Sequence, residues 1–202
     1  MSRRTTTLAA AVALALGATL ALAGCSSDPL AQQYLAGDNK NYIAGDGSVT
    51  EIAVGNRGKP VSFSGVTESG QKVDSAQYRG HVLVVNFWYA GCAPCRAEAP
   101  DLEKVYTQVQ PKGTNFLGVN VRDQAATITT FNEKFGISYP SIIDQNGQAQ
   151  LSFAADVPPN AVPTTLIVDA QGRVAARILG QLRDTSILTT LINDVAAEGT
   201  TK

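Results

Sequence analysis

One stretch decides the fold: residues 82–100, VLVVNFWYAGCAPCRAEAP. It opens with an unbroken apolar run, which is typical of a strand buried on both faces. Gly91 ends that strand, and beyond Cys95 the apolar residues recur at the spacing of a helix. These residues are Leu102, Val105, Tyr106 and Val109. The sequence therefore predicts that a buried strand passes directly into a helix over 93–109, with two cysteines at the junction.

The cysteine pair has the pattern of a redox site. Cys92 and Cys95 stand three residues apart in a first helical turn, close enough to form a disulfide without moving the backbone. Cys92 faces the free N–H groups of that turn, which lowers the pKa of its thiol below the free value of about 8.5. Pro94 suits this place, because the N–H that it lacks would have no helical partner.

Three other uses of a CxxC motif fit less well. A zinc site needs four ligands, and the chain holds three cysteines and one histidine in all. Cys25 and His81 are poorly placed to complete such a set, so no metal is expected. Covalent haem attachment needs a histidine after the second cysteine, where Arg96 stands. A purely structural disulfide would close too short a loop to constrain the unfolded chain much.

The N-terminus has the pattern of a bacterial export signal. Arg3 and Arg4 precede an apolar run, and its ending LAGC resembles a lipobox with Cys25 as the residue to be lipidated. We therefore expect a signal peptide over 1–24 and a lipid on Cys25 that holds the protein at the outer face of the cell membrane. An uncleaved membrane anchor and an ordinary signal that leaves Cys25 free stay open as alternatives.

The remaining chain predicts one domain. Residues 25–59 are rich in small and polar residues and are expected to form a flexible tether, although 49–54 could pack on the domain as an arm. The domain is expected over 60–197, with a short tail at 198–202. The chain carries 16 Lys and Arg against 17 Asp and Glu without a basic cluster, so nucleic-acid binding is not expected.

Strands and helices alternate along this domain. Beyond the cysteine motif we expect a hairpin near 61–74, a helical turn at 75–78, strands at 116–121, 141–143, 164–168 and 174–179, a short helix at 147–154, and longer helices after 123 and 184. Asp123 is expected to cap the first longer helix, and Ile187 to face inward in the last. This order predicts an α/β fold, a mixed sheet with helices on both faces and an N-terminal β-hairpin extension. The cysteine motif would lie at the carboxyl end of the central strand.

These motifs together resemble a known family. They are Asn86-Phe87-Trp88, the segment from Cys92 to Pro100, Val162-Pro163-Thr164-Thr165 and the turn Asp169-Ala170-Gln171-Gly172-Arg173. The combination resembles a thioredoxin-like fold of the TlpA/ResA-like kind. Members are exported, membrane-tethered thiol–disulfide oxidoreductases, some involved in cytochrome c maturation. The resemblance implies protein thiol or disulfide substrates, a membrane electron donor, a monomer, and no cofactor beyond the redox-active disulfide.

The resemblance also implies roles for the residues of the cysteine motif. Cys92 resembles the attacking cysteine and Cys95 the buried resolving one. Glu98 stands where this family places a half-buried glutamate, which would accept the proton of Cys95 if burial raised its pKa. Asn86 stands where ordinary thioredoxins carry a buried aspartate, which favours Glu98 as the proton acceptor. The alternative is a solvated Glu98 on the helix surface.

A substrate-binding surface is implied as well. Pro163 resembles the cis-proline that faces the CxxC, and Val162 would offer backbone pairing to a substrate strand. Pro94 and Trp88 complete the expected surface, although Trp88 could equally be a plain core aromatic. Gly91 departs from the family pattern, in which a tryptophan commonly precedes the first cysteine. Its presence predicts a flatter, more open surface around Cys92.

Two other functions stay open on the sequence alone. One is a thiol peroxidase of the same fold, although such enzymes usually carry a threonine where Tyr89 stands. The other is a non-catalytic binding or chaperone module that keeps the disulfide for structure. The Ala93-Pro94 pair between the cysteines resembles the Gly-Pro of reducing thioredoxins, which favours a reductase.

Overall fold

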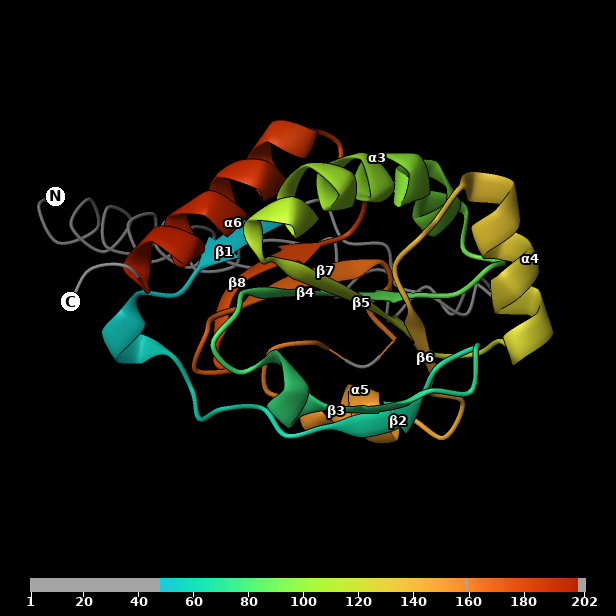
Figure 1. Cartoon of the computed structure of the whole chain (residues 1–202), viewed down its shortest axis with the longest axis horizontal. Helices are drawn as coiled ribbons and strands as arrows, with labels where there is room; N and C mark the ends of the chain where they lie inside the picture. The colour runs from blue at the N-terminus through green and yellow to red at the C-terminus, as the bar shows by residue number, and fades with distance from the viewer. Residues whose placement is uncertain (1–47, 159, 200–202) are drawn as a thin grey trace, which may run out of the picture. The chain divides into compact units, whose positions relative to one another are not determined.

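A six-stranded mixed sheet forms the centre of the fold (Figure 1). The computed structural model describes residues 48–158 and 160–199, so the expected signal peptide and Cys25 lie outside the described residues. The sheet consists of β1 (Ser48–Glu51), β8 (Val174–Leu179), β7 (Thr164–Val168), β4 (Leu83–Trp88), β5 (Asn115–Asn120) and β6 (Ser141–Ile143), in that spatial order. β4, β5 and β6 are parallel, whereas β7 pairs antiparallel with both β4 and β8. The mixed sheet is as predicted.

Helices and a hairpin cover the two faces of this sheet (Figure 1). The elements outside the sheet are η1 (Val54–Asn56), β2 (Ser64–Val66), β3 (Lys72–Asp74), η2 (Ser75–Tyr78), α3 (Ala93–Val109), η3 (Gln110–Lys112), α4 (Ala125–Phe135), α5 (Gln148–Ser152) and α6 (Thr185–Glu198). α3 and α6 lie on one face, and the β2–β3 hairpin and α5 on the other. None of the helices within the described ranges is long and apolar enough to cross a membrane.

The central strand β4 explains why both faces are covered. All six of its residues are buried, and successive side chains point to opposite faces. Val84 packs with Leu102 of α3 and Leu188 of α6. Val85 packs in the opposite core, together with Phe153 just after α5. An unbroken apolar run is therefore the sequence pattern that this double burial requires.

Two local expectations are wrong. Asp123 does not cap α4, which has Gln124 as its N-cap and no side-chain capping bond. The Asp123 carboxylate instead accepts hydrogen bonds from the Ala90 amide at 2.6 Å and from Asn120 Nδ2 at 2.9 Å. It thus ties the loop before α4 to the segment that leads into the CxxC motif. Ile187 is 40% exposed, because it lies beside the buried stripe of α6 and not within it.

The domain begins earlier than the sequence predicts. β1 pairs antiparallel with β8, from Ser48 opposite Leu179 to Glu51 opposite Ala176. All four residues of β1 are exposed, so β1 is held to the sheet by backbone hydrogen bonds. A strand held in this way needs no apolar pattern in its sequence. Residues 48–51 of the expected tether therefore lie in the sheet, which agrees with the alternative of an arm over 49–54 packed on the domain, and residues 25–47 lie outside the described residues.

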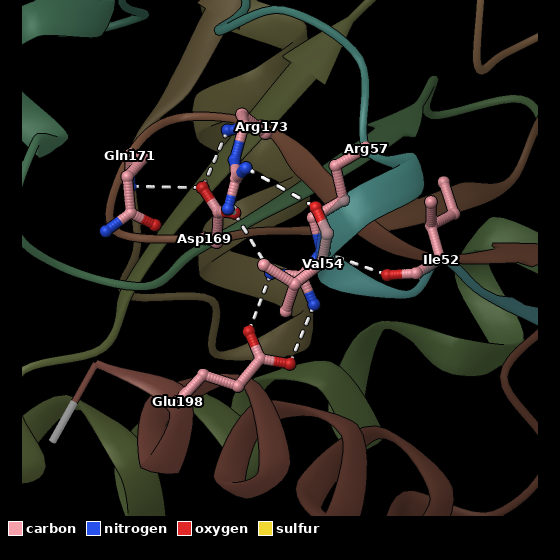
Figure 2. Close-up of polar contacts among 7 residues, drawn as sticks. All are labelled: Ile52, Val54, Arg57, Asp169, Gln171, Arg173 and Glu198. Atoms are coloured by element: carbon pink, nitrogen blue, oxygen red, sulfur yellow. Dashed lines mark hydrogen bonds and ion pairs between the residues drawn. The ribbon is translucent and has the colours of Figure 1, made fainter. Parts of the chain in front are cut away.

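Arg57 fastens this N-terminal segment to two distant parts of the domain (Figure 2). Its guanidinium donates to the Ile52 carbonyl at 3.0 Å, to Asp169 Oδ2 at 3.0 Å, and to both Glu198 carboxylate oxygens at 2.6 and 2.7 Å. Arg173 binds the same Asp169 carboxylate at 2.9 Å. We call Arg57, Asp169, Arg173 and Glu198 the arginine clasp. Because Glu198 ends α6 and joins this clasp, the tail predicted over 198–202 is wrong at its first residue.

Candidate active site

Cys92 and Cys95 form a disulfide at the start of α3, directly after the carboxyl end of β4. Their Cα atoms lie 5.3 Å apart. Cys92 is the N-cap residue of the helix, and the Cys95 amide donates a hydrogen bond to Cys92 Sγ at 3.2 Å. The same donor and the positive helix end would stabilise a Cys92 thiolate once the disulfide is reduced. The geometry therefore matches the predicted redox pair.

Both cysteines are buried in this oxidised form. Cys92 is 0% exposed and Cys95 is 2% exposed. The open surface that Gly91 predicts around Cys92 is therefore wrong, although Gly91 itself is exposed.

The proline loop has the backbone conformation that the resemblance implies. The peptide bond between Val162 and Pro163 is cis. The Pro163 carbonyl accepts a hydrogen bond from the Gly180 amide at 2.8 Å, which holds the loop against the segment after β8. Val162 is 1% exposed and belongs to the same apolar cluster as Cys92 and Cys95. The fold thus brings the loop and the cysteine motif together across about 70 residues of sequence.

Glu98 lies in the core beneath the start of α3 and is 0% exposed. Its Oε1 accepts a hydrogen bond from Asn86 Nδ2 at 3.0 Å, and its Oε2 accepts one from the Leu182 amide at 2.7 Å. Burial raises the pKa of Glu98 to about 8, although these two hydrogen bonds act in the opposite direction. Glu98 is therefore neither the half-buried residue of the resemblance nor a surface glutamate, but a fully buried one.

Asn86 connects Glu98 with the rest of the site. Its Nδ2 also contacts Thr165 Oγ1 at 3.1 Å, two residues after the cis-proline. Asn86 and Cys95 both line an internal cavity of about 10 Å³, which is close to the space occupied by one water molecule. The sequence assigns no role to the Leu182 amide or to the Thr165 hydroxyl, because nothing local marks a backbone donor or a buried hydroxyl as part of a site.

Trp88 is a core aromatic rather than an exposed contact for substrate. It is 5% exposed, and its ring packs against Phe131 of α4 with 4.3 Å between the ring centroids. Its Nε1 donates a hydrogen bond to Ser141 Oγ at 3.2 Å. Gly118 on β5 permits this contact, since a Cβ there would lie 2.8 Å from Trp88 Nε1. Of the four residues of the expected substrate surface, Pro94 is half-buried, whereas Trp88, Val162 and Pro163 are buried.

Comparison with known proteins identifies the family. The Redoxin family profile matches residues 53–192. The chain belongs to the Redoxin family. It is 33% identical over 133 residues to the thiol-disulfide oxidoreductase ResA of Geobacillus thermodenitrificans. This alignment covers 66% of this chain and 73% of the relative.

Similar solved structures agree with the observed fold. A DsbF homologue from Corynebacterium diphtheriae has a TM-score of 0.65 and 31% identity, over 74% of this chain and 94% of the homologue. A secreted thiol-disulfide isomerase from Corynebacterium glutamicum has a TM-score of 0.64 and 27% identity, over 80% of this chain and 97% of the isomerase. With the Cys92–Cys95 disulfide in place, this Redoxin chain is a thiol–disulfide oxidoreductase.

Proposed function

We propose that this oxidoreductase is anchored by a lipid on Cys25 at the outer face of the membrane and reduces disulfides in exported proteins. The N-terminal signal pattern supports the location, and the Ala93-Pro94 dipeptide supports the reducing direction. The motifs that resemble the TlpA/ResA-like family extend the proposal to substrate proteins that take part in cytochrome c maturation. The observation that carries the chemistry is the disulfide at the N-terminus of α3.

The proposed reaction has two exchange steps. The reduced Cys92 thiolate attacks one sulfur of the substrate disulfide, which forms a mixed disulfide and releases the first substrate thiolate. The Cys95 thiolate then attacks Cys92 Sγ and releases the second substrate thiolate. Two electrons pass from the cysteine pair to the substrate, and a membrane electron donor restores the two thiols for the next cycle.

Glu98 is proposed to move the proton of Cys95. The resolving step needs Cys95 as a thiolate, so its proton must go to a nearby base. Glu98 follows Cys95 by three residues on the same helix, and its pKa of about 8 lets both the neutral and the charged form exist near pH 7–8. The neutral form would return the proton when the disulfide is reduced again.

The proline loop is proposed to hold the substrate. The cis bond between Val162 and Pro163, and the place of Val162 in the same apolar cluster as Cys92 and Cys95, support backbone pairing between Val162 and an extended substrate segment. Backbone pairing is largely independent of side chains, so this contact would accept many substrate sequences.

Serine variants of the two cysteines test the proposed order of attack. Cys92→Ser should abolish reduction of insulin, because the activated thiolate is lost. Cys95→Ser should instead accumulate mixed disulfides on Cys92, since release needs the second thiol. Non-reducing gels and mass spectrometry of the trapped species provide the measurement. Trapping by Cys92→Ser and not by Cys95→Ser would reverse the assignment, and a wild type that reduces no disulfide would overturn the function.

A further inference from the structure

Residues at the start of α3 and along α4 line a hollow of about 400 Å³. The rings of Phe131 and Phe135 form its apolar wall, with 4.4 Å between their centroids. Ala90 and Thr130 line it as well. Its volume lies at the lower end of the range for ligand pockets, which suits one or two side chains of a peptide.

The charged groups of this hollow are both positive. Arg96 of α3 and Lys134 of α4 line it, and none of its lining residues is acidic. Neither cation forms an ion pair with any residue in the ranges 48–158 and 160–199. The nearby Asp123 carboxylate is engaged by the Ala90 amide and by Asn120. The hollow therefore combines an apolar wall with two cations that have no anionic partner among the described residues.

The hollow adjoins the redox pair along the chain. Ala90 precedes Cys92 by two residues, and Arg96 directly follows Cys95. A substrate segment whose disulfide meets Cys92 would therefore place neighbouring residues near the hollow. A second copy of this chain is a poor occupant of such a site, since facing hollows would bring four cations together.

We propose that this hollow binds an aromatic or large aliphatic side chain and an adjacent carboxylate, both carried by the protein substrate close to its target disulfide. The apolar side chain packs on Phe131 and Phe135, and the carboxylate pairs with Arg96 or Lys134. The oxidoreductase thus selects acidic, apolar segments, whereas backbone pairing at Val162 is indifferent to side chains. The inference rests on the proposed reductase function and adds its substrate preference.

Single-turnover kinetics with designed peptides test this preference. The pre-reduced protein is mixed with peptides that each carry one internal disulfide, flanked by Phe and two Asp, by Phe and two Lys, or by Ser alone. Acid quenching and mass spectrometry give the rate at which each peptide disulfide becomes two thiols while Cys92 and Cys95 become a disulfide. We expect the acidic peptide to react about 10-fold faster than the Lys peptide at low salt, with the ratio falling at high salt.

Variants at the hollow test the contribution of its charge and the contribution of its shape separately. Lys134→Glu should lower the rate for the acidic peptide by about 5-fold or more and raise the rate for the Lys peptide. Lys112→Glu makes the same change of charge at the other end of α3 and should leave the ratio of rates unchanged. Thr130→Trp should fill the hollow and remove the advantage of the Phe peptides over the Ser peptide.

The outcomes distinguish this inference from the proposed function. Equal rates for the acidic, Lys and Ser peptides, unaltered by Lys134→Glu and Thr130→Trp, would overturn the substrate preference while leaving disulfide reduction intact. A wild type that reduces none of the peptides would overturn both. A Lys112→Glu effect as large as that of Lys134→Glu would mean that net charge, not the hollow, sets the preference.

Discussion

At the scale of single residues, Glu98 shows how tertiary contacts change the chemistry of a carboxyl group. In the sequence it is one glutamate in a helix. In the fold its burial raises its pKa from the ordinary value of 4.5 to about 8. The hydrogen bonds from Asn86 and Leu182 limit that shift but do not cancel it. A carboxyl group poised near neutral pH is suited to exchange protons with a thiol.

Glu98→Gln should change how the stability of the domain depends on pH. Because the folded-state pKa of Glu98 lies above the unfolded value, its contribution to stability is complete below pH 4.5 and is lost as the pH rises toward 8. The free energy of unfolding of the wild type, minus that of the variant, should therefore fall over this interval by up to roughly 5 kcal/mol. Urea unfolding of the oxidised forms at several pH values measures this difference.

The same variant should alter thiol chemistry as well as stability. Loss of the titrating group should slow insulin reduction by about 10- to 100-fold, within the range for acid–base groups, and change the pH dependence of Cys92 alkylation. Glu133→Gln is the matched control, since it makes the same chemical substitution on an exposed side chain of α4. If the plots of unfolding free energy against pH are parallel for Glu98→Gln and the wild type, and their plots of alkylation rate against pH coincide, Glu98 takes no part in proton transfer.

At the scale of elements, the arginine clasp joins segments that the sequence keeps far apart. Arg57 lies 112 residues from Asp169 and 141 residues from Glu198. Burial by itself would raise the pKa of Asp169, but the hydrogen bonds from Arg173 and Arg57 outweigh it and hold that pKa below its usual value. The clasp links the segment after β1, the turn between β7 and β8, and the end of α6 (Figure 2).

Arg57→Met should destabilise the domain by about 2–4 kcal/mol, because it removes a partner of the buried Asp169 carboxylate. The side chains of Arg57 and Asp169 are each only 3% exposed. Glu198→Gln should cost less than about 1 kcal/mol, since its side chain is 37% exposed and water replaces the lost contact. Thermal and urea unfolding of both variants provide the measurement. Equal effects of the two substitutions would contradict a buried clasp.

At the scale of the whole molecule, the proposed location at the membrane depends on a segment outside the described residues. The domain carries its redox site at one end of the sheet, and the proposed lipid on Cys25 would restrict where that site works. Residues 25–47 lie between the proposed lipid site and the first described strand, β1.

Cys25→Ala should release the protein from the membrane fraction, since no other lipid attachment is proposed. Fractionation of cells that express the wild type and the variant measures the change, and intact mass of the mature wild type should show the added lipid. Purified Cys25→Ala should reduce insulin at the wild-type rate, because Cys25 takes no part in exchange. A wild type without added mass at residue 25 would refute the anchor.

The sequence by itself determined the elements whose signals are local. The sequence predicted three elements nearly to the residue: β4 from its apolar run, α3 from its helical spacing, and the turn at 169–172. These signals are local, because the conformational preference of a residue and the spacing of apolar residues depend only on a few neighbouring positions. The CxxC motif at the strand–helix junction likewise predicted the redox pair. The resemblance to the TlpA/ResA-like family predicted the cis bond at Val162–Pro163, which no local pattern indicates.

Tertiary structure alone decided the environment of each functional group. Glu98 is fully buried because α3 lays it against β4 and the Leu182 amide arrives from 84 residues away. β1 joins the sheet through backbone bonds that leave no apolar pattern. The burial of a side chain, the pKa of Glu98 and the hollow beside α4 all depend on contacts between segments that are distant in the sequence. These contacts form only when the chain folds.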